Sequence, residues 1–74
     1  MIPFDVAARW RDGERVPGVA FPPGAHVRIL EGPFADDCGR VRDLLEIEPE
    51  SCYRIEVDAA HVEVEVSESG LTTL

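Results

Sequence analysis

Lysine is absent from this chain, so every basic side chain that it carries is an arginine. Fifteen acidic residues oppose seven basic ones, which gives a formal net charge of −8. A chain this acidic is repelled by phosphate backbones, whose neutralisation provides most nonspecific affinity for nucleic acids. The composition therefore argues against a general DNA- or RNA-binding protein, although it leaves room for a local basic patch.

Long hydrophobic runs are missing as well. No apolar segment approaches the roughly 20 residues that a helix needs to cross a bilayer. The N-terminus does not show a basic segment followed by an apolar one, which is the pattern of a signal peptide. We therefore expect a cytoplasmic protein that does not enter a membrane.

From Ala25 onward, short segments alternate apolar and polar residues, which is the pattern of half-buried strands. The third segment is the clearest, because Tyr53, Ile55 and Val57 alternate with charged residues. Val41 and Leu44 both suit the core but are three positions apart, which predicts a β-bulge near Arg42-Asp43. The predicted strands are 26–31, 39–45, 52–57 and 61–67, followed by a short turn at Gly70-Leu71.

Short strands and tight turns in so small a chain predict an all-β fold, and an SH3-like five-stranded barrel is the economical arrangement. A chain of 74 residues buries only about 60% of its unfolded surface, so most apolar strand positions must lie in the core. Residues 24–74 are predicted to form this barrel. Its predicted core consists of Val27, Ile29, Val41, Leu44, Tyr53, Ile55, Val57, Val62, Val64, Val66 and Leu71.

Residues 1–23 are predicted to form a separate N-terminal arm and linker, because they are rich in proline and glycine. Apolar spacing favours a short helix from Phe4 to Arg11, or a loose arm. The competing interpretation is a hairpin turning at Asp12-Gly13, since this dipeptide is a strong hairpin signal. Trp10 either docks onto the barrel or is presented to a partner.

The stretch from Gly24 to Val41 has a distinctive order: a strand, then Gly32-Pro33, then Phe34, and re-entry into a strand at Gly39. It resembles the KOW motif of NusG-type transcription elongation factors, and the resemblance extends over about 24–71. It implies a KOW-type SH3-like barrel. In those factors this barrel docks a ribosomal protein or the termination factor Rho through two neighbouring loops.

Two features of the sequence depart from the pattern of that family. Asp37 and Cys38 stand where a second aromatic residue usually follows the Gly-Pro-Phe sequence. The second contact loop is reduced to the short segment Asp58-Ala59-Ala60. Half of the familiar contact surface is therefore missing, and the chain resembles a KOW barrel standing on its own.

The favoured hypothesis is a small, monomeric, non-enzymatic module that docks a protein partner, in transcription or on the ribosome. An aromatic residue at a loop tip is typical of an interface anchor, so Phe34 is the first candidate contact residue. The alternative for Phe34 is that it folds back and caps one end of the barrel. The predicted partner-binding residues are Pro33, Phe34, Asp36, Asp37 and Trp10.

Two other functions stay open. An arginine stripe on the outer face of the sheet would contact RNA, although cross-strand pairs of Arg54 with Asp43 and of Arg42 with Glu56 would neutralise part of it. An acidic SH3-like decoy that occupies the basic surface of a DNA-binding protein would suit the net charge of −8. The residues of the predicted stripe are Arg28, Arg40, Arg42 and Arg54.

No pattern in the sequence indicates catalysis, a cofactor or a metal. His26 and His61 lie at predicted strand ends without a nucleophile and base around them. Asp36 and Asp37 fall short of the six to eight oxygen ligands that calcium takes. The sequence therefore favours a protein that is not an enzyme.

The two cysteines, Cys38 and Cys52, are expected to be free thiols. They lie toward opposite ends of a predicted hairpin, which at about 3.3 Å per residue separates them by roughly 20 Å. A disulfide requires Cα atoms within about 7 Å. Without a suitably spaced histidine pair they do not form a zinc site either.

Overall fold

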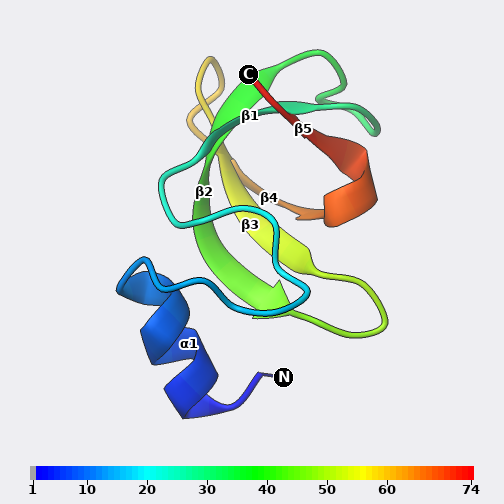
Figure 1. The fold of residues 1–74 in the computed structure, drawn as a ribbon. Coiled ribbons are helices and arrows are strands. Elements are labelled where there is room, and N and C mark those ends of the chain that lie inside the picture. The colour runs from blue at the N-terminus through cyan, green and yellow to red at the C-terminus, as the bar shows by residue number, and fades with distance from the viewer. Residues whose placement is uncertain (1) are drawn as a thin grey trace.

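The computed structural model describes residues 2–74, which form one antiparallel sheet preceded by a short helix (Figure 1). The sheet order is β4-β3-β2-β1-β5. The predicted β-rich class is confirmed. Within residues 2–74 no ladder joins β4 to β5, so the curved sheet is open and a closed barrel is not observed. The elements are α1 (Phe4–Arg11), β1 (His26–Ile29), β2 (Cys38–Glu46), β3 (Cys52–Val57), β4 (Glu63–Ser67), the 3-10 turn η1 (Glu68–Gly70) and β5 (Leu71–Thr73).

The predicted β-bulge lies in β2. Val41 pairs with Ile55 and Asp43 with Arg54, so Arg42 is the extra residue between two successive pairs. An extra residue shifts the alternation by one position, and Val41 and Leu44 therefore both reach the core.

The fifth strand lies where the sequence predicted only a turn. Leu71 pairs with Ile29 and Thr73 with Val27, so β5 extends the sheet beyond β1. Leu71 is buried as expected. A strand of three residues is too short to display the alternation from which the other strands were recognised.

The core contains most of the predicted residues, with one error and two additions. The assignment of Val62 was wrong: it is 41% exposed, because β4 begins only at Glu63. Val64 is half-buried, since it belongs to a strand at the edge of the sheet. Trp10 and Phe21, both from the N-terminal segment, are buried in the same cluster.

The helix predicted over 4–11 is confirmed, and the hairpin and the loose arm are not observed. The helix ends at Asp12-Gly13, where Gly13 has a φ of +85° that suits glycine. Trp10 is 2% exposed, and its Nε1–H donates to the Phe21 carbonyl at 2.9 Å. The N-terminal segment is therefore integrated into the core that the sheet provides.

Three polar side chains hold the N-terminal segment onto the sheet. The Ser51 hydroxyl donates to the Gly18 carbonyl at 2.6 Å. The Tyr53 hydroxyl accepts the Ala20 N–H at 3.2 Å and donates to Glu68 Oε1 at 2.7 Å. Glu68 Oε1 also accepts the Ala20 N–H, at 2.8 Å. These bonds provide partners for backbone groups of the N-terminal segment where it meets the sheet.

The Tyr53 ring is fully buried and meets Phe21 edge to face, with ring centroids 5.5 Å apart. Burial, together with the hydrogen bond to Glu68, raises the pKa of Tyr53 to about 12. The folded state therefore favours the neutral phenol more strongly than the unfolded chain does. This contribution to stability is complete below a pH of about 10, the ordinary tyrosine pKa, and is lost as the pH rises through about 12.

We expect Tyr53→Phe to abolish that alkaline loss of stability, because phenylalanine has no proton to release. At neutral pH the same variant should lose about 1–3 kcal/mol, since Glu68 and the backbone at 20–21 lose a partner. Chemical unfolding of both proteins across alkaline pH measures both effects, and the absence of lysine simplifies this pH range. Parallel pH profiles for the two proteins would contradict the assignment.

Gly39 lies in β2 where its backbone is closely packed against β3. A Cβ built on Gly39 would stand 2.5 Å from the Glu56 carbonyl oxygen and 2.7 Å from Ile55 Cγ2. Backbone cannot move aside as a flexible side chain can, so this position has no room for a side chain.

Gly39→Ala should therefore destabilise the protein by about 2 kcal/mol or more, on the scale of overpacked cores. Ala59→Val, in the exposed turn after β3, is the control and should stay within about 0.5 kcal/mol of wild type. Denaturant melts compare the three proteins. Equal stability of Gly39→Ala and wild type would show that the strands do not approach this closely.

Candidate functional site

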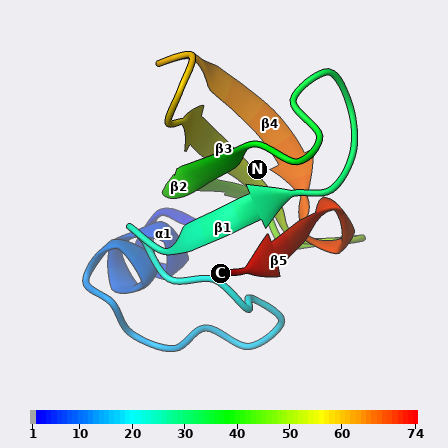
Figure 2. The ribbon, with the colours of Figure 1, turned by 90° about the horizontal axis from the view of Figure 1, so that it is seen from above.

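A groove of about 340 Å³ lies between the loop that connects β1 to β2 and the edge strand β4. The loop comprises residues 30–37 and is called the Gly-Pro-Phe loop below. Figure 2 shows this loop arching beside β4. The volume is at the lower end of the range for ligand-binding clefts. The residues that line the groove are Ile29, Glu31, Gly32, Pro33, Phe34, Val64, Glu65, Val66 and Ser67.

Backbone hydrogen bonds fix the shape of the Gly-Pro-Phe loop. Ile29 donates to the Asp37 carbonyl and accepts the Asp36 N–H, both at 2.8 Å, so the base of the loop is closed. Asp37 donates to the Phe34 carbonyl at 3.0 Å. Gly32 and Asp36 have positive φ values of 82° and 74°, which tighten the turn. The loop is therefore shaped before any partner arrives.

Phe34 is half-buried and packs against the core cluster. The sequence left two alternatives for it, an exposed anchor and a buried cap, and the structure places it between them. Pro33, beside it, is exposed. Together they give the groove one rigid apolar wall, and Val64 and Val66 of β4 give it another.

The charged residues that line the groove are both acidic. Glu31 comes from the loop side and Glu65 from β4. Glu63 is exposed on the same outer face of β4 as Glu65 and lies 3.8 Å from the Arg54 guanidinium. Glu65 is opposite Arg54 in the ladder, and within residues 2–74 it makes no ion pair. The groove is therefore apolar within and negatively charged at its rim.

The other predicted partner-binding residues do not line this groove. Asp36 is exposed and Asp37 half-buried in the loop, where their backbone groups close its base. Trp10 is buried in the core, so it offers no surface to a partner. The residues that the sequence reasoning missed are Glu31 and those of β4. Val64 and Val66 had been recognised only as core positions.

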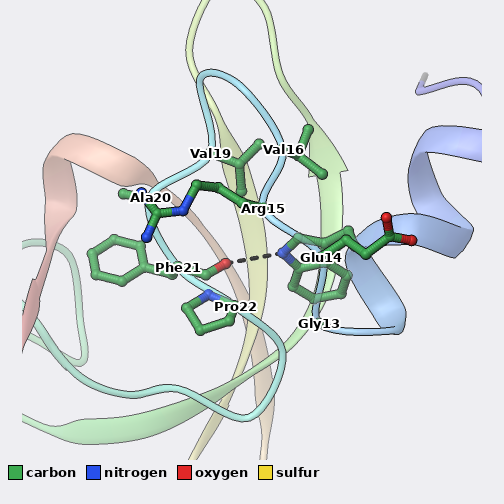
Figure 3. A pocket seen from close by; sticks show the side chains of 9 residues that line it. Gly13, Glu14, Arg15, Val16, Val19, Ala20, Phe21 and Pro22 are labelled. Atoms are coloured by element: carbon green, nitrogen blue, oxygen red, sulfur yellow. Dashed lines mark hydrogen bonds between the residues drawn. The ribbon is translucent and has the colours of Figure 1, made fainter.

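A second hollow, of about 390 Å³, lies between the end of α1 and the segment 13–22 (Figure 3). Its main polar groups are already paired, because the Phe21 carbonyl accepts the indole N–H of Trp10. The Arg15 guanidinium lies on the side of Ala20, whereas the Glu14 carboxylate points away toward α1. The hollow presents no set of unpaired polar groups that converge on a ligand, and we assign it to the packing of the N-terminal segment.

The four arginines of the predicted stripe lie on three neighbouring strands, interleaved with acidic residues. Arg42 contacts Glu56 at 2.6 Å, and Arg54 lies 3.7 Å from Asp43, as the cross-strand interpretation predicted. Arg40 donates to the Gly24 carbonyl at 3.3 Å. Arg28 makes no ion pair within residues 2–74. The outer face is therefore a mixed surface rather than a continuous basic stripe.

Both cysteines are free, as expected, and both are half-buried. Burial raises the pKa of the Cys52 thiol, and the nearby Glu65 contributes to this shift. Among residues 2–74, no group of three or more histidine, cysteine, aspartate or glutamate side chains is arranged to hold a metal ion. Nor does any helix in that part of the chain have the length and apolar character needed to cross a bilayer.

The chain was compared with protein-family models and with curated proteins. No protein-family model matches the chain, and a search of curated proteins finds no match either.

Phe34→Ala should destabilise the protein by about 1–2 kcal/mol, less than the 3–5 kcal/mol of a fully buried aromatic, because the ring is only half-buried. The matched control is Phe4→Ala, which removes a ring that is 83% exposed and should change stability by about 0.5 kcal/mol or less. Thermal or denaturant melts provide both values. A loss as large as that of a core aromatic would make Phe34 a structural cap instead of a contact residue.

Proposed function

We propose that this chain is a small non-enzymatic protein-docking module of the KOW type, an SH3-like barrel that is open on one side, acting in transcription or translation. The observation that carries the proposal is the half-buried Phe34 on a rigid loop, beside a preformed apolar groove. The resemblance to KOW domains supports it, because the Gly-Pro-Phe sequence occupies the loop between β1 and β2.

The rigidity of the Gly-Pro-Phe loop supports docking, since an interface that is ordered beforehand loses less entropy on binding. An aromatic side chain with part of its surface free is a favourable anchor, because hot spots are enriched in aromatic residues within pockets. The groove also joins two segments that are distant in sequence. A partner would therefore recognise the folded domain and not a linear motif.

The RNA-contact alternative has less support. Arg42 and Arg54 are engaged by acidic neighbours on the same face, and the whole chain carries a charge of −8. A phosphate backbone would have to compete with these ion pairs. The decoy alternative shares the acidic charge with our proposal but gives the apolar groove no role.

Affinity capture from a lysate of the source cell tests the proposal, with wild-type protein, Phe34→Ala and the control Phe4→Ala as baits. We expect wild type and Phe4→Ala to retain the same protein partner. Phe34→Ala should lose at least 2 kcal/mol of binding free energy, on the scale of an interface hot spot. Digestion of RNA in the lysate should leave the retained partner in place.

Two outcomes would contradict the proposal. Retention of the same partner by Phe34→Ala at wild-type strength would show that the Gly-Pro-Phe loop is not the contact. Release of the partner by ribonuclease would favour the RNA alternative, and variants of the four outward arginines would then be the next test.

A further inference from the structure

Among the residues that the structure describes, none pairs with one edge of the strand β4. Val57 N–H donates to the Val62 carbonyl and Glu68 N–H donates to the Ser51 carbonyl, both at 2.8 Å. Hydrogen-bonded positions alternate along an antiparallel ladder, so Val64 and Val66 also direct their backbone groups toward β3. The N–H and carbonyl groups of the intervening residues point the other way. Those residues are Glu63, Glu65 and Ser67.

Within residues 2–74 these outward backbone groups have no hydrogen-bond partner, because β4 is the last strand on its side of the sheet. The groove lies against the same strand, from Val64 to Ser67. An unpaired edge is a template for another strand, and peptide recognition by strand addition uses such edges. Here the template and an apolar groove lie side by side.

The side chains of β4 define what a strand on this edge would need. Val64 and Val66 point into the groove, where Phe34 and Ile29 also lie. Glu63 and Glu65 alternate with the valines and are exposed, and Glu65 also reaches the rim of the groove. A strand added to β4 would alternate in the same way, with every second side chain in the groove and the others beside the two glutamates.

We propose that the partner of this domain contributes an extended segment of alternating basic and apolar residues, which pairs with the free edge of β4. This inference rests on the proposed docking function and specifies its mode. The apolar side chains of the segment fill the groove between Phe34 and Val64. Its lysine or arginine side chains lie beside Glu63 and Glu65, with Glu31 at the other rim.

Charge complementarity selects this occupant over a second copy of the chain. Pairing two β4 edges would bring Glu63 and Glu65 of both copies together, and like charges placed opposite each other are destabilising. Two chains of charge −8 also repel each other at a distance. Glu65 makes no ion pair within residues 2–74 and attracts a basic segment, and Glu63, 3.8 Å from the Arg54 guanidinium, adds to the same negative rim.

The first test uses a synthetic peptide that alternates valine and arginine, added to the isotope-labelled full chain. Nuclear Overhauser contacts between the peptide backbone and residues Glu63 to Ser67 are expected, with an antiparallel or parallel strand pattern. A peptide with glutamate in place of arginine, and one with N-methyl groups along its pairing edge, are the controls. Each control should bind at least about tenfold more weakly, a change of 1.4 kcal/mol.

The second test removes the edge donor from the domain itself. Glu65→Pro deletes an N–H that takes no part in the β3–β4 ladder, and edge strands tolerate proline at such positions. Glu65→Thr is the matched control, because it removes the charge but keeps the N–H. Both variants should unfold cooperatively, and the peptide should bind Glu65→Pro several-fold more weakly than Glu65→Thr.

Several outcomes would overturn the strand pairing. One is that the N-methylated peptide binds as tightly as the unmodified peptide; others are that the peptide does not bind, or that its contacts lie outside β4. Contacts at the β4 edge that increase with protein concentration in the absence of peptide would instead indicate a second copy of the chain. If Glu65→Pro does not fold, binding of the N-methylated and unmodified peptides to the wild-type chain still tests the strand pairing. Failure of the docking function is distinguishable, because lysate capture would then be insensitive to Phe34→Ala. If partner capture is lost with Phe34→Ala but kept with Glu65→Pro, the docking function stands and only the pairing with the β4 edge is excluded.

Discussion

The arrangement of this chain depends on the hydrogen bonds of the Tyr53 hydroxyl. It joins β3 to η1 through Glu68 and holds the backbone of Ala20 and Phe21 against the sheet. Phe21 in turn accepts the indole N–H of Trp10, so the helix is fixed to the same point. Without this connection, the N–H of the buried Phe21 would lose its acceptor. A small sheet thereby gains two aromatic side chains that its own strands do not supply.

The N-terminal segment covers one end of the sheet, and the Gly-Pro-Phe loop lies at the other end (Figure 1). This distribution gives the two ends different roles. At the first end the aromatic side chains of Trp10 and Phe21 are buried, and the Trp10 indole N–H is paired with the Phe21 carbonyl. At the second end the structure keeps a half-buried Phe34, an apolar groove and the unpaired edge of β4 together. This composition is the basis of the proposed docking of a protein segment, and the acidic rim is the basis of its proposed basic character.

Local patterns in the sequence predicted the parts of the fold that local physics determines. Strict alternation located β3 to the residue, and the three-residue spacing of Val41 and Leu44 located the bulge. The pattern failed where contacts are distant in sequence. Phe21 stands next to two prolines in a segment without periodicity, and its burial depends on Tyr53. The groove likewise depends on the position of a loop beside β4, which no pattern within either segment encodes. Pro33 and Phe34 were therefore found, and Glu31 and the β4 residues were missed.

Amide hydrogen exchange of the free protein tests most directly whether β4 keeps an unpaired edge along a preformed groove. Paired amides exchange only when the structure opens, whereas unpaired amides at an exposed edge exchange readily. The account predicts alternation along β4, with slow exchange at Val64 and Val66 and fast exchange at Glu65 and Ser67. Uniformly slow exchange through all four residues would contradict it, because the edge would then already be occupied.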